Sequence, residues 1–425
     1  LRPVLGLNKA DSVAPWLTLD GNAYPAVVDG KVLWILDGYT TSATYPNSRL
    51  TDLKDATSDS VTETSAAVTS LANGQINYIR NSVKATVDAY SGAVTLYAWD
   101  ESDPVLRAWM RTFPGAVRPL TEMSGDLMTH VRYPQDLLKI QRVVLARYHI
   151  TDPSAFYSGN DVWAVPKDPT HDTQDQPTYY QSISMPGQDA PAFSLTSTFV
   201  PAGTGPQILR GFLAADGDAG SSSGQRSDGY GSLRLLALPP NSTVAGPSQV
   251  ENKIESATVA SQNPEQRLDL RAFINQNRGS GATFTFGNLL TLPVGGGLLY
   301  VQPLYVQQAK TGGSSPLNVA TVAVFGDKIG WGDTLGQALD GVFGTTDGGG
   351  VDTGTDPGTT TPPSTGGGGT TDSLAAAIAR AQAAYDDGQK ALKAGDFTAY
   401  GEAQKRLEAA LTDIAKLAPK PTSTP

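Results

Sequence analysis

The chain contains no cysteine, only three histidines and four methionines, and no long hydrophobic run. The absence of cysteine excludes disulfides, cysteine-ligated zinc and thiol catalysis. With only His130, His149 and His171 available, a multi-histidine metal centre is not expected, and no motif predicts a cofactor. No stretch approaches the roughly 20 apolar residues that span a bilayer, so no transmembrane helix is expected within this chain.

Positive charge is also scarce, with 31 lysines and arginines against 41 acidic residues and a formal net charge of -10. Binding to a phosphate backbone needs a concentrated basic face, so we expect no nucleic-acid partner. Neither a Walker A sequence nor a G-x-G-x-x-G fingerprint occurs, and nucleotide binding therefore has no support.

Glycine and proline are abundant, with 45 and 29 residues, and one stretch near the C-terminus is dominated by glycine and threonine. Residues 344–371 consist almost entirely of Gly, Thr, Pro and Asp, a composition typical of a flexible linker. Residues 372–418 are instead rich in Ala, Leu, Gln and charge, with apolar residues at helical spacing. Gly395 suits the end of one helix and Asp396 the cap of the next, so we predict a helical hairpin and then a disordered tail, 419–425.

Residues 1–343 show short strand-like runs that are joined by turns far more often than by helices. Asp29-Gly30 and Ser91-Gly92 are typical of the turns of two hairpins. Helices are predicted over residues 103–113, 134–148 and 334–343. The fold class expected is therefore α+β, with mostly antiparallel sheets and a few packed helices. The region is long enough for two subdomains, about 1–170 and 171–343.

The strongest candidate for a binding site is the stretch from Asp37 to Tyr45, interpreted as a polar loop at the end of the first hairpin. Asp37, Tyr39, Thr40, Thr41 and Tyr45 would offer carboxylate, phenol and hydroxyl groups on a rigid support. The alternative is a hydrogen-bonded loop that packs Tyr39 and Tyr45 onto the core. The sequence leaves both open.

Tyr148 and His149 form a second candidate at the C-terminal end of the 134–148 helix. A histidine at this end is stabilised in its protonated form by the helix dipole and can titrate near neutrality. The alternative, which we favour, is that both side chains simply pack the helix end against the sheet.

Two patterns resemble catalytic groups. Asp100, Glu101 and Asp103 could supply paired carboxylates, but a helix cap at Asp103 is the commoner arrangement. The segment Gly220–Gly224 matches G-x-S-x-G, although it lies in a glycine- and serine-rich loop without the strand-to-helix context that a nucleophile elbow needs. No catalytic residue is therefore predicted.

Several long segments resemble uncharacterised protein family 0182, a bacterial membrane-protein family. They include APWLTLDGNAYP (14–25), VDGKVLWILDGYTTSATYP (28–46), RYPQDLLKIQ (132–141) and GNLLTLPVGGGLLYVQPLYVQ (287–307). The resemblance runs from about Val13 to Phe343 and is poorer between Ala257 and Phe286.

The resemblance implies several transmembrane helices before this region and a large domain outside the cytoplasm. Because the chain also begins at Leu1, we expect it to be the extracytoplasmic part of a longer protein of the cell membrane. The family supplies no activity and no catalytic residues. A membrane-anchored PDZ protease, whose gene often neighbours those of the family, is one partner that it suggests.

These observations favour a non-enzymatic module that binds a protein partner or a component of the cell envelope. Two alternatives stay open. One is the outer domain of a transporter for a lipid-like or envelope substrate, and the other is a carboxylate-dependent envelope hydrolase.

Overall fold

A computed structural model describes residues 10–344, except 66, 67, 69, 73, 204, 280–281 and 308–314, together with Ala383, Ala403, Lys405 and Arg406. The chain divides into two compact units, Leu1–Val351 and Asp352–Pro425, and the fold below is that of the first. The predicted linker, helical hairpin and tail lie outside the described residues, apart from Gly344 and those last four positions. Their structure and the division into two subdomains stay predictions.

The first sheet is built around a long central strand, β3 (Lys31–Ser42). On one side β3 pairs with β1 (Thr18–Leu19) and β2 (Tyr24–Val28), and on the other with β6 (Tyr78–Asp88), which is followed by β7 (Val94–Ala98). The β2–β3 turn places Asp29 at φ 48° and Gly30 at φ 75°. This is the left-handed pair that a tight hairpin requires, and it confirms the predicted turn.

Seven short helices occur in the same half of the described chain. They are α2 (Leu53–Thr57), α3 (Ser60–Thr64), α4 (Pro104–Thr112), η1 (Leu120–Glu122), α5 (Gly125–His130), α6 (Gln135–Tyr148) and α7 (Pro153–Ser158). The predicted helices at 103–113 and 134–148 are confirmed by α4 and α6. Asp103 caps α4 with hydrogen bonds from the backbone N–H groups of Val105 and Leu106, and Pro104 occupies the first turn. A two-stranded ribbon, β4 (Thr51–Asp52) with β5 (Gln75–Ile76), lies beside α2.

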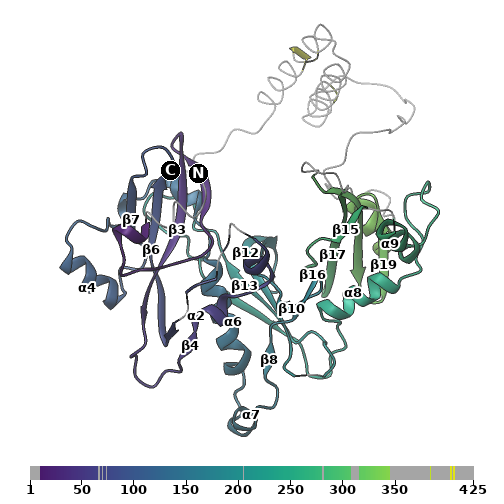
Figure 1. Ribbon diagram of the computed structural model, residues 1–425, viewed down its shortest axis with the longest axis horizontal. Helices are drawn as coiled ribbons and strands as arrows, with labels where there is room; N and C mark the ends of the chain where they lie inside the picture. The colour runs from purple at the N-terminus through teal and green to yellow at the C-terminus, as the bar shows by residue number, and fades with distance from the viewer. Residues whose placement is uncertain are drawn as a thin grey trace, which may run out of the picture. The chain divides into compact units, whose positions relative to one another are not determined.

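The second and third sheets follow in chain order (Figure 1, teal and green). The second comprises β8 (Trp163–Ala164), β11 (Tyr179–Ile183), β12 (Ala192–Pro201), β13 (Gly211–Asp216) and β14 (Leu233–Ala237). Its order is β11–β12–β13–β14, with β8 paired to β12. A separate ribbon pairs β9 (Lys167–Asp168) with β10 (His171–Asp175).

The third sheet comprises β15 (Thr283–Phe286), β16 (Leu290–Val294), β17 (Gly297–Gln307), β18 (Leu317–Phe325) and β19 (Lys328–Gly332). Its order is β15–β17–β18–β19, with β16 paired to β17.

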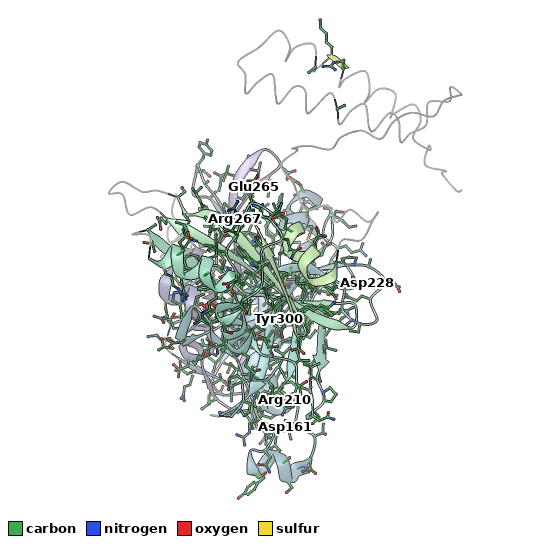
Figure 2. The ribbon with its side chains drawn as sticks, turned by 90° about the vertical axis from the view of Figure 1, so that its right-hand side faces the viewer. Asp161, Arg210, Asp228, Glu265, Arg267 and Tyr300 are labelled. Atoms are coloured by element: carbon green, nitrogen blue, oxygen red, sulfur yellow. The ribbon has the colours of Figure 1, made fainter. Side chains whose placement is uncertain are left out.

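Three helices accompany the third sheet: α8 (Pro247–Ser256), α9 (Leu270–Arg278) and α10 (Leu335–Phe343). The sequence predicted α10 but neither α8 nor α9. Their apolar residues Val250, Ile254 and Ile274 join Trp331 in one buried cluster. Tyr300 belongs to the same cluster, its hydroxyl donates to the carbonyl of Ala245, and Figure 2 labels it.

Every pairing between named strands in the described part of the chain is antiparallel. The α+β fold class and its mostly antiparallel sheets are thereby confirmed. Within the same residues, no helix has both the length and the apolarity of a membrane span.

Candidate functional site

The stretch predicted as the polar loop is mostly strand, and this part of the interpretation was wrong. β3 continues through Ser42, and Asp37 to Ser42 pair with β6, so only residues 43–45 of the stretch leave the sheet. Residues 35–40 are all buried because both faces of β3 are covered. Polar side chains can occupy such a strand because each finds a hydrogen-bond partner from a distant segment.

Asp37 forms a buried ion pair with Lys84 of β6, directly opposite on the neighbouring strand. The two side chains are 6% and 1% exposed. The Lys84 ammonium also donates to the carbonyl of Arg132 at 3.1 Å and lies 5.0 Å from the centre of the Trp99 ring. Burial raises the pKa of Asp37 to about 6 even though Lys84 opposes the shift.

Tyr39 contacts a second group of buried ionisable side chains. Its hydroxyl donates to Asp20 at 2.5 Å, and the same carboxylate oxygen accepts from the backbone N–H of Asp136 at the start of α6. Lys139, one turn along α6, lies 3.5 Å from Asp136 and 2.8 Å from Asp59. Burial first, and then the charge of Asp20, raise the pKa of Asp136 to about 8.

Thr40 contributes to the cap of α4. Its hydroxyl donates to Asp103 at 2.6 Å, and the hydroxyls of Ser82 and Tyr78 donate to the same carboxylate at 2.7 and 2.5 Å. Burial alone would raise the pKa of Asp103, but these hydrogen bonds hold it below its ordinary value. Asp103 is completely buried and its oxygens are occupied, so it is placed as a structural cap. Asp100, its proposed catalytic neighbour, pairs with Arg80 at 3.1 Å.

Replacing Asp103 with alanine is expected to lower the free energy of unfolding by about 2–3 kcal/mol. The variant loses a helix cap and leaves buried hydroxyl donors without an acceptor. Chemical denaturation would measure the loss, with Asp100→Ala as the matched control because that carboxylate is partly exposed. Equal stability of the two variants would contradict the structural role of Asp103.

The remaining predicted residues of the first candidate lie at the exposed end of the strand. Thr41 is partly buried, and its hydroxyl lies 3.4 Å from that of Thr18. Tyr45 is 53% exposed and stacks on Tyr78 at 5.6 Å between ring centres. Asn77 fixes the loop here, since its side chain bonds both the N–H and the carbonyl of Tyr45.

Directly after Tyr45 the chain forms one wall of an open groove of about 590 Å³. The opposite wall is α6, which contributes Val143, Val144 and Tyr148. Those three side chains and Leu50 on the facing wall are 41–54% exposed. Polar residues complete the lining: Asn47, Ser48, Arg49, Thr51, Asp52, Asp55 and Gln75. This groove is the candidate site, because it combines exposed apolar side chains with a polar rim.

The side chains of Tyr148 and His149 lie in different surroundings at the end of α6. Tyr148 lines the groove, whereas the His149 ring is nearly buried and stacks on Trp163 at 3.6 Å between ring centres. His149 Nδ1 lies 2.9 Å from the carbonyl oxygen of Leu145, and Nε2 lies 4.0 Å from Asp161, which Figure 2 labels. His149 therefore packs the end of α6 against the second sheet, which is the alternative that the sequence favoured. Tyr148 instead lines the candidate groove.

Leu137, Ile140, Val144 and Tyr148 share one helical stripe of α6, which is buried only in part. Ile140 is buried and Leu137 partly buried, whereas Val144 and Tyr148 are exposed. The buried side chains include Asp136, Lys139 and Arg142. One feature of the sequence could have indicated this pairing, since Asp136 and Lys139 are oppositely charged and stand at i,i+3 spacing on the helix.

Other catalytic patterns receive no support from the geometry. The Gly220–Gly224 loop packs closely on residues 120–125, where the hydroxyl of Ser223 donates to the carbonyl of Met123. Asp216, a few residues before this loop, forms an ion pair with Arg234 at 2.6 Å. Across the described ranges, no group of three His, Cys, Asp or Glu side chains is arranged to hold a metal ion.

In the part of the chain that the structure describes, the fold and site define an α+β protein of three five-stranded antiparallel sheets and two small ribbons, with an open groove beside α6. The chain belongs to the uncharacterised protein family UPF0182, whose family model matches residues 7–266.

Three relatives illustrate the family. UPF0182 proteins of Kineococcus radiotolerans and an Arthrobacter species are 51% and 52% identical over 95% of this chain, covering 41% and 40% of their own length. A UPF0182 protein of Bifidobacterium longum is 47% identical, with 95% of this chain and 39% of its own length covered. The chain thus spans about two fifths of these relatives. No solved structure matches it.

Proposed function

We propose that this chain is a non-enzymatic binding module on the extracytoplasmic side of a bacterial membrane protein. It would hold a partner protein in the groove between residues 47–56 and α6. The observation that carries the proposal is the exposure of Leu50, Val143, Val144 and Tyr148 around one concave surface. Apolar side chains clustered in this way are typical of interaction sites, whereas single exposed ones are not.

The groove has the composition of a protein-binding surface. Aliphatic and aromatic side chains provide the apolar contacts, and Arg49, Asp52 and Asp55 supply the charged rim. Tyr148 is the side chain expected to contribute most, since tyrosines are enriched among residues that dominate binding. A membrane-anchored PDZ protease is one candidate partner, and a component of the cell envelope is another.

The test is co-purification of the whole membrane protein from native cells after crosslinking. Val144→Asp places a charge in the groove and should abolish recovery of the partner. Tyr157→Asp is the matched control, because Tyr157 is 92% exposed on α7 and does not line the groove. Equal recovery of the same partner with both variants would refute the groove as its binding site.

A second candidate function rests on a separate cavity. Between the second and third sheets lies a space of about 470 Å³, lined mostly by apolar and glycine residues that include Met185, Leu236, Leu238, Val244 and Leu298. Such a lining suits a lipid-like ligand and supports the transporter alternative. Mass spectrometry of the purified protein distinguishes the two functions, since a retained lipid lost on Leu236→Asp would favour transport.

A further inference from the structure

A third cavity lies at the junction of the first two sheets, away from the groove beside α6. Its volume is about 340 Å³. Residues of β2, the end of α5 and the segment after it, the start of β12 and the loop after β13 line it, among them Tyr24, His130, Arg132, Phe193 and Asp218. The central feature is the guanidinium group of Arg132.

Arg132 is held by stacking on aromatic rings. Its guanidinium carbon lies 4.3 Å from the centre of the Tyr24 ring and 5.5 Å from that of Tyr180. Both rings are themselves fixed: the Tyr24 hydroxyl donates to the carbonyl of His130, and the Tyr180 hydroxyl donates to that of Tyr133. Tyr180 also stacks on Phe193. An arginine placed over aromatic faces loses little freedom on binding and keeps its N–H edges available.

The backbone of Arg132 is equally well fixed. Its N–H donates to the hydroxyl of Tyr24, and its carbonyl accepts from Lys84 and from the hydroxyl of Tyr230. The guanidinium group, in contrast, has no ion pair or side-chain hydrogen bond among the described residues. Arg278 provides the comparison, since it also lies over two aromatic rings, Phe284 and Phe286, but is paired with Glu255.

The charges around the cavity define the anion that it can accept. Asp218 lies on its wall, and Asp126 lies 4.0 Å from His130. These carboxylates oppose multiply charged anions more strongly than singly charged ones, because like-charge repulsion grows with ligand charge. Tyr24, Pro25 and Phe193 offer the apolar contacts for a ligand body. The ligand class that fits is a small monocarboxylate with an apolar group.

We propose that this cavity is a carboxylate-binding site in which Arg132 forms a two-pronged hydrogen bond with the ligand. A guanidinium group matches a carboxylate in this planar geometry, and the pair is stronger than a neutral hydrogen bond. The site is independent of the proposed partner-binding groove, because none of its residues lines that groove.

Titration of the full 425-residue chain with benzoate tests the proposal, with binding followed by ligand-observed NMR. Benzoate should bind in the millimolar range expected of so small a ligand, while the neutral benzyl alcohol and inorganic phosphate should bind at least about tenfold more weakly. Arg132→Gln should weaken benzoate binding at least about tenfold, and Arg132→Lys should restore only part of it. Asp218→Asn should tighten binding, since it removes a like charge.

Arg278→Gln is the matched control and should leave benzoate binding unchanged. Thermal unfolding of each variant separates loss of the site from loss of the fold. The proposal is overturned if benzoate fails to bind the folded chain, if Arg132→Gln binds it as well as the unaltered chain does, or if phosphate binds more tightly than benzoate.

Discussion

Replacing Lys84 with methionine is expected to lower the free energy of unfolding by about 3–5 kcal/mol. Asp37 would then be buried without its partner, because both side chains of the pair are almost completely inaccessible. The variant also loses the hydrogen bond to the carbonyl of Arg132 and the contact of the ammonium with Trp99. Chemical denaturation, compared with the unaltered chain, gives the difference directly.

Two further variants show whether the loss comes from burial of the charge. Lys167→Met breaks an ion pair of similar geometry with Asp175, 2.6 Å long, whose side chains are 53% and 35% exposed. Exposed pairs contribute at most about 1 kcal/mol, so this variant should be nearly neutral. The double variant Asp37→Leu with Lys84→Met should recover much of the loss, because no unpaired charge is left. A Lys84→Met effect no larger than that of Lys167→Met would contradict this account.

Stability is expected to fall as the pH rises from about 5 to about 8. Burial raises the pKa of Asp136 from its ordinary value of 3.8 to about 8. The folded chain therefore keeps a proton that the unfolded chain releases, and the stability present below the unfolded pKa is lost as the pH approaches the folded pKa. One such carboxyl contributes a slope of about 1.4 kcal/mol per pH unit.

Other buried acids also change the free energy of unfolding with pH, so the slope can be assigned to Asp136 only over part of the pH range. Burial also raises the pKa of Asp37 to about 6 and that of Glu251 to about 7, with the same sign. Asp103 has the opposite sign, since its lowered pKa contributes stability above the unfolded pKa that is lost in acid. The slope between about pH 7 and pH 8 should therefore come mainly from Asp136 and be much reduced in Asp136→Asn. Denaturation midpoints measured across this range would reveal it, and a flat profile for the unaltered chain would contradict the prediction.

Features fixed by neighbouring residues could be predicted from the sequence. The Asp29-Gly30 turn needs only two residues that tolerate left-handed backbone, and both adopt it. The start of α4 needs only an acceptor at Asp103 followed by Pro104. Helices α8 and α9 were missed although Pro247 and Asp269 mark their starts, because the Pro, Gly, Asn and Ser residues around them are typical of loops when considered alone.

Features that depend on distant residues could not be predicted in this way. The hydroxyl and carboxyl groups of Asp37, Tyr39 and Thr40 are typical of a loop when considered alone. Their partners lie far along the chain, at Lys84 for Asp37 and at Asp103 for Thr40. The candidate groove depends on the same kind of arrangement, since Leu50 and Val144 become one surface only when the segment after β3 meets α6.

The most direct test of the proposed binding module is a photo-reactive amino acid placed at position 144 of the full-length protein in native cells. Irradiation should yield a discrete crosslinked product whose mass identifies the partner, and that product should disappear when Tyr148 is replaced with alanine. The same amino acid at position 157, on exposed α7, should yield none. No product from position 144, or an identical product from both positions, would contradict the account.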